Sequence, residues 1–409
     1  MRVSLKSDTG KNIMMTRENI KNKDQLSILG FGCMRFPMMG NSIDEPRSVA
    51  LLKSAVDHGV NYFDTAYIYN GGKSEVLLGK ALSGGYRERV KIADKLPTFM
   101  VAKLEGAKKM FATQLSRLGT DYVDYYLLHM LTDKASFDRM ADIGVIAWME
   151  DLKAKGIIRN IGFSFHGGKT DFEQIITAYP WDICQIQYNY LDVNNQATKS
   201  GLQLAYALGI PVVIMEPLRG GKLVNKLPEE VIKTFQSLDA DRTPAEWALR
   251  WIWNHPEVSV VLSGMSDENQ LEENVLIASG VRANSMTEEE LDVFDRVKAI
   301  LLKKTKIPCT GCAYCMPCPF GVNIPGCFSE YNDKYLLGGK GHRMKYMQTL
   351  GALSKKPAYA SVCMECGRCE KHCPQNIKIR QELKQVSKEM EGILLKRVVK
   401  IVRRIMKLK

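Results

Sequence analysis

Long apolar segments are missing from this 409-residue chain. No apolar run reaches the length needed to span a bilayer, and residues 1–24 contain no apolar stretch typical of a signal peptide. We therefore predict a cytoplasmic protein. Hydrophobic residues make up 45% of the chain and charged residues 25%, a composition that is typical of a globular protein and not of a disordered or fibrous one.

Cysteine is scarce in the first 300 residues, where it occurs only as Cys33 and Cys184. The other nine cysteines follow from residue 309 onward. Thiols stay reduced in the cytoplasm, and clustered cysteines there are metal ligands more often than disulfide partners. We therefore expect the cysteine-rich segment to bind metal, and Cys33 and Cys184 to be small residues of a packed core.

A Gly-rich GxGxxG turn, expected after the first strand of an open doubly wound sheet, is also missing. The segment Gly30–Arg35 (GFGCMR) has two of these glycines and then stops. Eight short β-rich runs do alternate with helical patterns, at 27–35, 61–66, 90–95, 121–129, 160–165, 183–189, 211–217 and 258–264. Mostly apolar strands, each followed by a helix, indicate parallel pairing. Eight such units match an α/β fold of the (β/α)₈ TIM-barrel type.

Four polar residues lie at or just beyond the carboxyl ends of three successive predicted strands. They are Asp64, Tyr69, Lys95 and His129. In a barrel, such positions line the active site. A nearby ammonium such as Lys95 favours the phenolate form of a tyrosine, while Asp64 can orient the lysine and His129 can hydrogen-bond a substrate oxygen. Taken singly, each residue is commonly structural; together they predict Tyr69 as a general acid toward a carbonyl that accepts hydride.

From about Leu26 to Asn274 the sequence resembles the aldo-keto reductases. The resemblance rests on segments in the family's order and spacing: NYFDTAYIYNGGKSEVLLGKAL, KIADK, DYVDYYLLH, IGFSFH, QIQYN, PVVIMEPLRGG and GMSDENQLEEN. It implies a nicotinamide cofactor, NADP or NAD, held across the barrel mouth. It also implies that a catalytic tetrad is formed by Asp64, Tyr69, Lys95 and His129, with Tyr69 as the proton donor.

The resemblance also assigns cofactor contacts by position. Ser164 and Gln187 correspond to the pair that binds the nicotinamide carboxamide. Met215 stands where a tyrosine commonly stacks on the nicotinamide. The segment that resembles the adenosine-phosphate clamp contains Gly264, Ser266, Gln270, Glu273 and Asn274.

Several positions depart from the family's pattern. Phe165 stands where members often have asparagine. Gly264 and Gln270 replace the lysine and arginine that many members place against the 2′-phosphate of NADP, a group that favours cationic partners. NADPH and NADH therefore both stay open. Arg219, after the seventh strand, is either a pyrophosphate ligand or an exposed arginine.

Two cysteine runs, each ending in Cys-Pro, make up the C-terminal module. The first run contains Cys309, Cys312, Cys315 and Cys318, and the second contains Cys363, Cys366, Cys369 and Cys373. The second run has the bacterial ferredoxin spacing and the first is one residue shorter. Three closely spaced cysteines followed by Cys-Pro, found twice, favour two [4Fe–4S] clusters over a pair of zinc knuckles.

The ligand pairing follows only from resemblance to two-cluster ferredoxins, in which each run lends its last cysteine to the other cluster. One cluster would then be held by Cys309, Cys312, Cys315 and Cys373, and the other by Cys363, Cys366, Cys369 and Cys318. The shorter first run leaves this pairing open. Cys327 is either a spare residue or a substitute ligand.

We predict three parts: an aldo-keto reductase barrel (1–304), a ferredoxin-like α+β domain (305–385) and a basic helical tail (386–409). The tail has eight Lys and Arg against two Glu, and supplies +6 of the formal net charge of +12. Its apolar and basic residues fall on opposite faces of a helix. Such a helix can dock on an anionic membrane surface or an acidic redox partner, or pack on its own protein. The tail has no stacking aromatics among its basic residues, which argues against nucleic acid.

The sequence therefore predicts an NAD(P)-dependent oxidoreductase that reduces an aldehyde or ketone and carries two [4Fe–4S] clusters. Nicotinamides move two electrons and a cluster accepts one, so electron exchange between them needs a flavin or another converter. The clusters are then either structural or redox-sensing beside a self-contained reductase, or a relay from an external carrier to a flavin or substrate at the barrel. A non-catalytic docking or electron-carrier subunit is a third alternative, which the intact tetrad disfavours.

Overall fold

The computed structural model describes residues 14–40, 42–225, 227–309, 315–336, 341–350, 357–373 and 376–392. The chain folds as two compact units. The first contains the residues up to Gly220 and Thr243–Glu288, and the second contains Gly221–Arg242 and the residues from Glu289 onward. Helix α12 (Glu288–Lys304), which the sequence analysis placed in the barrel domain, therefore groups with the second unit.

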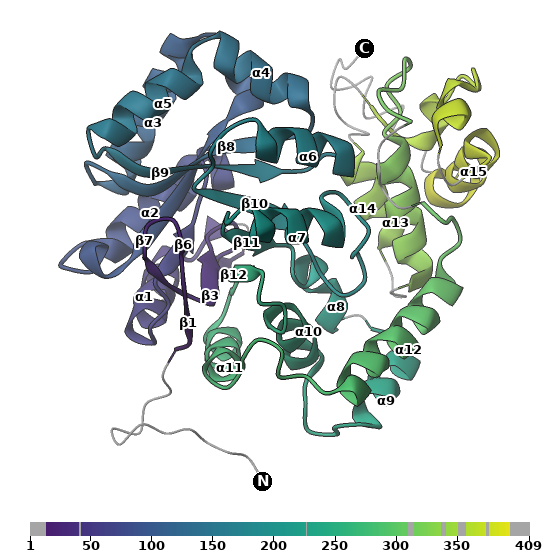
Figure 1. The fold of residues 1–409 in the computed structure, drawn as a ribbon. Coiled ribbons are helices and arrows are strands. Elements are labelled where there is room, and N and C mark those ends of the chain that lie inside the picture. Colours follow the sequence, from purple (N-terminus) through teal and green to yellow (C-terminus); the bar gives the residue numbers. More distant parts are fainter. Residues whose placement is uncertain are drawn as a thin grey trace. The chain divides into compact units, whose positions relative to one another are not determined.

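The first unit is a closed barrel of eight parallel strands with helices around it (Figure 1). The strands are β3 (Leu29–Gly32), β6 (Tyr62–Asp64), β7 (Lys91–Pro97), β8 (Val123–Leu131), β9 (Ile158–Phe165), β10 (Ile183–Gln187), β11 (Val212–Met215) and β12 (Val258–Ser263). Each strand pairs with the next one in the chain, and β12 pairs with β3 to close the barrel. The eight strands and the TIM-barrel fold predicted from the sequence are confirmed.

Helices connect the barrel strands and cover them. They are α1 (Glu45–Asp57), α2 (Lys73–Leu82), α3 (Leu104–Leu118), α4 (Lys134–Asp142), α5 (Val145–Ala154), α6 (Lys169–Thr177), α7 (Thr198–Ala207), α10 (Pro244–Trp253) and α11 (Glu268–Ser279). Local sequence explains several starts. Thr243 accepts a hydrogen bond from the Glu246 amide and precedes Pro244, while Asp267 accepts one from the Gln270 amide. These side chains satisfy amides that have no partner within the helix.

The N-terminal end of the barrel is sealed by the antiparallel hairpin of β1 (Thr16–Glu18) and β2 (Gln25–Ser27). From this hairpin the Arg17 guanidinium donates hydrogen bonds to the carbonyls of Trp253, His255 and Val258. The barrel interior above it is an apolar cluster that includes Tyr62, whose ring centroid lies 5.6 Å from that of Tyr125. Polar contacts also occur at this end, where the Tyr125 hydroxyl donates to Asp24 at 2.7 Å and accepts from Asn22 at 3.1 Å.

The second unit is helical within its described residues. Besides α12 it contains α8 (Lys222–Asn225), α9 (Glu229–Gln236), α13 (Ile324–Leu336), α14 (His342–Thr349) and α15 (Ile379–Val386). Phe235 of α9 packs on Phe294 of α12, with ring centroids 5.5 Å apart, and Lys222 forms an ion pair with Asp333 of α13. The segment that leaves barrel strand β11 is thus held to the helices around the cysteine-rich module.

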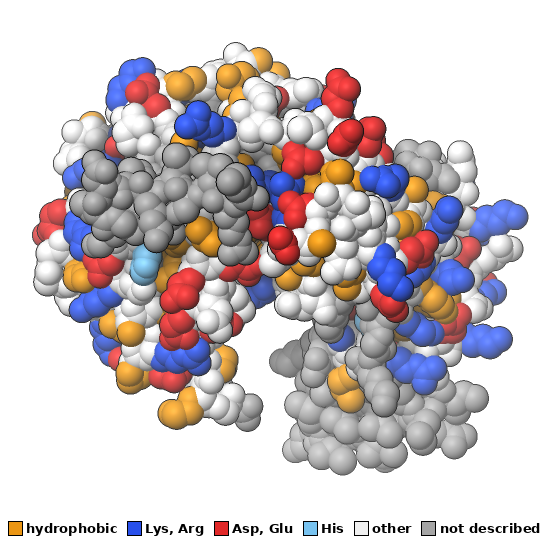
Figure 2. Space-filling model, turned by 90° about the horizontal axis from the view of Figure 1, so that it is seen from below, with side chains coloured by type: hydrophobic (Ala, Val, Ile, Leu, Met, Phe, Trp, Pro, Cys, Tyr) orange, Lys and Arg blue, Asp and Glu red, His pale blue; other side chains and the backbone are white. Residues whose placement is uncertain are grey.

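The surface carries charges of both signs. On the face drawn in Figure 2, basic and acidic side chains are interspersed. None of the helices that the structure describes is long and apolar enough to cross a membrane. Most of the predicted basic amphipathic helix, from residue 393 to 409, lies outside the described residues.

Close packing of α2 on the end of α3 makes Gly79 a sensitive position. A Cβ atom at Gly79 would lie 2.5 Å from the carbonyl oxygen of Leu118, a backbone atom that cannot move aside. We therefore expect Gly79→Ala to lower the free energy of unfolding of the barrel by about 1–3 kcal/mol. All five tryptophans lie in the first unit. Tryptophan fluorescence in urea therefore reports the unfolding of this unit and not that of the second unit.

Gly106→Ala is the matched control, because a Cβ atom there would meet nothing within 4 Å. This substitution should raise stability by about 0.4–1 kcal/mol, since alanine has less backbone freedom in the unfolded chain. Equal stability changes in the two variants would contradict the packing argument.

Candidate active site and cysteine-rich module

The structure brings the four predicted catalytic residues together at the C-terminal ends of strands β6, β7 and β8. The Lys95 ammonium on β7 lies 2.5 Å from Asp64 Oδ1 at the end of β6, and it also donates to the carbonyl of Thr65 at 2.8 Å. The same nitrogen lies 5.0 Å from the centroid of the Tyr69 ring. The His129 ring, on β8, meets the Tyr69 ring edge-on at 5.8 Å. The four side chains therefore lie close together at one end of the barrel.

The loop that carries Tyr69 is held by a network behind it. Tyr69 begins a short turn (Tyr69–Gly72) whose last residue, Gly72, has φ +88° and immediately precedes α2. A Cβ atom at Gly72 would lie 2.5 Å from the Arg117 guanidinium carbon. Arg117 itself donates to the Tyr67 carbonyl at 3.1 Å and to Glu75 at 2.7 Å. Glycine at this turn therefore lets α3 anchor the tyrosine loop.

Burial and charge act in opposite directions on Tyr69. Burial raises the pKa of its hydroxyl, and the lowering effect of Lys95 is smaller, so the net pKa lies above the usual value. The ammonium favours the phenolate, as expected, but the effect of burial is larger. For Lys95, burial lowers the pKa, but Asp64 and Tyr69 outweigh it and the pKa is raised. At neutral pH the pair is therefore a protonated phenol beside an ammonium.

His129 is a neutral imidazole in this environment. Burial, followed by repulsion from Lys95, lowers its pKa to about 3. Its Nδ1 is buried and has no hydrogen-bond partner among the described residues. A neutral ring can donate one hydrogen bond to a substrate oxygen without adding charge to the site.

Sequence reasoning missed a second histidine and a buried acid beside these residues. His166, in the segment IGFSFH, acts electrostatically on His129, and burial lowers the pKa of His166 to about 4. Asp94 precedes Lys95 and accepts a hydrogen bond from its amide at 2.7 Å, with the other carboxylate oxygen buried. Burial, and then Glu75, raise the pKa of Asp94 well above its usual value. The sequence did contain a signal for both residues, because Asp94 directly precedes Lys95 and His166 lies two residues after Ser164.

The predicted nicotinamide contacts lie on neighbouring strands. Ser164 on β9 accepts a hydrogen bond from the Met130 amide at 2.9 Å. Gln187 ends β10 and donates to Asp192 at 3.2 Å. Met215, at the end of β11, is half-buried against the interior cluster. A hydroxyl and a carboxamide side by side supply the donors and acceptors that a nicotinamide carboxamide needs, so these residues fit the group.

The predicted adenosine-phosphate clamp lies around the first turns of α11, where its side chains bond to their neighbours. Gln270 accepts from the Ser266 amide at 3.0 Å, and Asn274 donates to the Ser263 hydroxyl at 3.0 Å. Glu273 accepts from the Thr243 hydroxyl at 2.6 Å. Gly264 has no side chain to contribute. The clamp segment therefore presents polar and acidic groups, with no lysine or arginine between residues 264 and 274.

Arg219 is neither free nor fully exposed. Its guanidinium forms an ion pair with Asp192 at 3.1 Å, and 21% of its side chain is exposed. The sequence analysis left Arg219 as either a pyrophosphate ligand or an exposed arginine. The structure shows a mostly buried side chain whose positive charge is balanced by Asp192.

The cysteine-rich module places both runs around one cavity of about 510 Å³. Its sulfur-bearing lining includes Cys315 and Cys318 from the first run and Cys363, Cys366 and Cys369 from the second. Cys309 and Cys373 pack against the same hydrophobic core. Cys312 lies outside the described residues, and within them no three potential ligands are close enough together to hold a metal ion. The soft thiolate donor set drawn from both runs nevertheless suits an iron–sulfur cluster.

Cys327 differs from these seven cysteines. It is fully buried in the core of the module, where its sulfur lies 3.7 Å from both the Ala358 carbonyl and the Tyr346 hydroxyl. Burial raises the pKa of the thiol to about 12. These contacts favour the interpretation of Cys327 as a packed core thiol over that of a substitute ligand.

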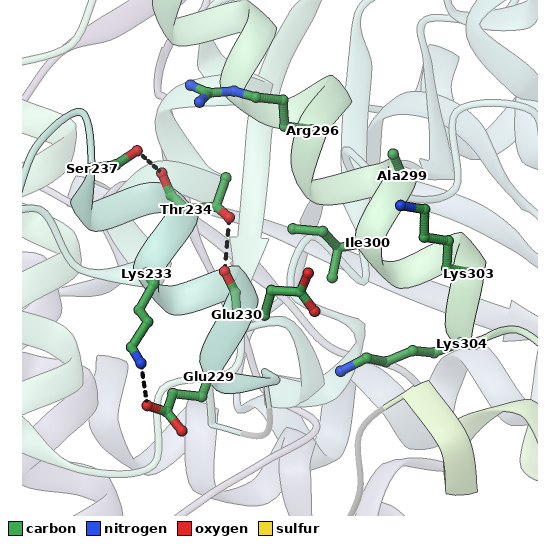
Figure 3. A pocket seen from close by; sticks show the side chains of 10 residues that line it. All are labelled: Glu229, Glu230, Lys233, Thr234, Ser237, Arg296, Ala299, Ile300, Lys303 and Lys304. Carbon is green, nitrogen blue, oxygen red and sulfur yellow. Dashed lines mark hydrogen bonds and ion pairs between the residues drawn. The ribbon is translucent and has the colours of Figure 1, made fainter.

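A separate cavity of about 810 Å³ lies between α9 and α12 (Figure 3). Glu229, Glu230 and Lys233 of α9 face Lys303 and Lys304 of α12 across it. Its charges of opposite sign are partly paired, as in the Glu229–Lys233 ion pair at 2.7 Å. None of the predicted site residues lines this cavity, and we assign no chemistry to it.

Comparison with known proteins agrees with both parts of the chain. Residues 28–297 match the aldo/keto reductase family, and residues 308–379 match a 4Fe-4S dicluster domain. "Probable aldo-keto reductase 1" of Glycine max is 26% identical over 311 residues, which cover 67% of this chain and 86% of that protein. L-galactose dehydrogenase of Arabidopsis thaliana is 28% identical over 297 residues, covering 68% and 91%.

A solved structure shows the same similarity. The holo form of aldo-keto reductase AKR11C1 from Bacillus halodurans has a TM-score of 0.59 and 28% identity, covering 69% of this chain and 96% of its own. With its closed eight-stranded barrel and its C-terminal 4Fe-4S domain, this chain belongs to the aldo/keto reductase family of NAD(P)-dependent oxidoreductases.

Proposed function

We propose that the barrel reduces the carbonyl of an aldehyde or ketone by hydride transfer, with Tyr69 as the general acid. The observation that carries this proposal is the buried Lys95 ammonium, held by Asp64 at 2.5 Å and lying 5.0 Å from the Tyr69 ring. Ser164 and Gln187 would hold the carboxamide of a reduced nicotinamide, which would supply the hydride. The chain's own residues control the proton.

Each residue then has one role. Because the pKa of Tyr69 is raised, its hydroxyl keeps the proton until a carbonyl oxygen develops negative charge. Lys95 stabilises the phenolate that remains, and Asp64 keeps the ammonium in place. His129, neutral at physiological pH, donates a hydrogen bond to the same substrate oxygen. Positioned donors aimed at a developing oxyanion are a major source of catalysis.

We also propose that the C-terminal module binds two [4Fe–4S] clusters through the eight cysteines of the two runs. Support comes from the cavity that thiols of both runs share, and from the match to a dicluster domain. A self-contained reductase with structural or redox-sensing clusters needs no electron converter. This is the simpler of the two roles that the sequence left open. We further propose a cytoplasmic location and a redox partner. Both proposals rest on the sequence alone.

Tyr69→Phe tests the role of the proton donor. The substitution should lower kcat for carbonyl reduction about 10²- to 10⁴-fold, the usual contribution of a general acid, while nicotinamide binding, measured by fluorescence, stays unchanged. Tyr86→Phe is the control, because that hydroxyl bonds Asp57 on the exposed surface. Carbonyl turnover of Tyr69→Phe within a few-fold of wild type would remove Tyr69 from the mechanism.

The pH profile tests the protonation states. The pKa values of His129 and His166 are lowered to about 3 and about 4, while those of Tyr69 and Lys95 are raised above their usual values of 10.0 and 10.5. The reactive form of the site therefore persists across the neutral range, and kcat/KM should be flat from about pH 5 to 9. Activity should fall only at higher pH, as Tyr69 loses its proton. An ionisation near 6.5 that disappears in His129→Gln would show that His129 titrates.

Metal content tests the cluster proposal. Anaerobically prepared protein should contain about eight iron and eight sulfide per chain. Cys366→Ser should lower both, because Cys366 lies in the shared cavity, whereas Cys327→Ala should retain them, because Cys327 is a core thiol. Stoichiometric zinc without sulfide would overturn the proposal.

A further inference from the structure

The loop after β3 carries an arginine across the ends of the seventh and eighth barrel strands, β11 and β12. A Cβ atom added to Gly264, just after β12, would lie 3.5 Å from Cδ of Arg35. A Cβ atom added to Gly220, after β11, would lie 2.6 Å from a terminal nitrogen of the same side chain. The aliphatic stem of Arg35 therefore crosses Gly264, and its guanidinium reaches Gly220. A side chain at Gly220 would crowd the guanidinium, whereas a Cβ atom at Gly264 would make an ordinary van der Waals contact with the stem.

Within the described residues, the charge of Arg35 is not balanced, unlike that of Arg219 and Arg47. Arg219, in the same loop as Gly220, pairs with Asp192 at 3.1 Å, and Arg47 pairs with Glu268 of α11 at 2.5 Å. In the part of the chain that the structure describes, no hydrogen bond or ion pair joins the Arg35 side chain to another residue. A guanidinium has five N–H donors, and none of those of Arg35 is used in a hydrogen bond within the described residues.

The position suits a phosphate ligand. In (β/α)₈ barrels, the loops after the seventh and eighth strands frequently bind phosphate. A guanidinium binds phosphate oxygens in a bidentate manner. The clamp segment itself has no cation, and residues 264–274 include four carboxylates instead, Asp267, Glu268, Glu272 and Glu273. Arg35 thus supplies from another loop the positive charge that this segment lacks.

We propose that Arg35 binds the pyrophosphate of the nicotinamide dinucleotide. The inference rests on the proposed function, because it requires a dinucleotide at the barrel mouth. The pyrophosphate is preferred over a 2′-phosphate because the guanidinium lies beside Gly220 in the loop after β11, whereas the carboxylates are in the first turns of α11. The pyrophosphate is common to NADH and NADPH, so Arg35 serves either cofactor equally.

Dissociation constants for NADH, NADPH and ADP-ribose, measured by fluorescence on the anaerobic cluster-loaded protein, test this proposal. Arg35→Ala should raise all three about 10- to 100-fold, the loss expected for hydrogen bonds to a charged group. Arg35→Lys should recover part of the affinity, because an ammonium supplies the charge without the bidentate geometry.

Arg89→Ala is the control for charge, because it removes one exposed cation that pairs with Asp57 at 3.0 Å. It should leave all three dissociation constants unchanged. Unaltered affinities in Arg35→Ala, with wild type binding normally, would overturn the role of Arg35. A loss confined to NADPH would place Arg35 on the 2′-phosphate and would equally overturn the pyrophosphate assignment. Failure of wild type to bind any of the three ligands would instead contradict the proposed function.

Discussion

The ion pair between Lys95 and Asp64 is the interaction on which the site depends. The Lys95 side chain is fully buried, and an ammonium taken out of water loses several kcal/mol of hydration unless partners replace it. Asp64 and the Thr65 carbonyl replace that hydration at 2.5 and 2.8 Å. Breaking a buried pair of this kind typically costs about 3–5 kcal/mol, because one charge is left without compensation. Lys95 can therefore stay charged only while β6 and β7 are paired in this register, which places Asp64 beside it.

The rest of the barrel directs this charge toward one tyrosine. The hairpin held by Arg17 closes the N-terminal end, and the apolar interior keeps water from reaching Lys95 from below. Arg117 fixes the Tyr69 loop by bonding the Tyr67 carbonyl and Glu75. The result is a phenol whose pKa is raised by burial and lowered, to a smaller extent, by the adjacent ammonium. These opposed effects suit the general-acid role proposed for Tyr69.

The two units of the chain contain different groups of candidate functional residues. The barrel unit contains the tetrad and the candidate dinucleotide contacts, with Arg35 reaching the ends of β11 and β12. The second unit contains the cysteine runs, together with Gly221–Arg242, which the chain inserts between β11 and α10. A loop of the barrel is therefore built into the unit that carries the cysteines.

Local sequence determined the eight barrel strands, the positions of the tetrad and the two cysteine runs, because strand alternation, strand ends and ligand spacing are short-range properties. What the sequence did not determine depends on atoms far apart in the chain. The direction of the Tyr69 pKa follows from burial outweighing the charge of Lys95, and the pairing of Arg219 with Asp192 follows from two separate loops. Arg35 became a candidate ligand only in the structure, because the pairing of β12 with β3 places it beside Gly264. Burial of a group and contact between distant residues both arise from tertiary packing. For that physical reason, only the structure could show the pKa direction of Tyr69 and the surroundings of Arg219 and Arg35.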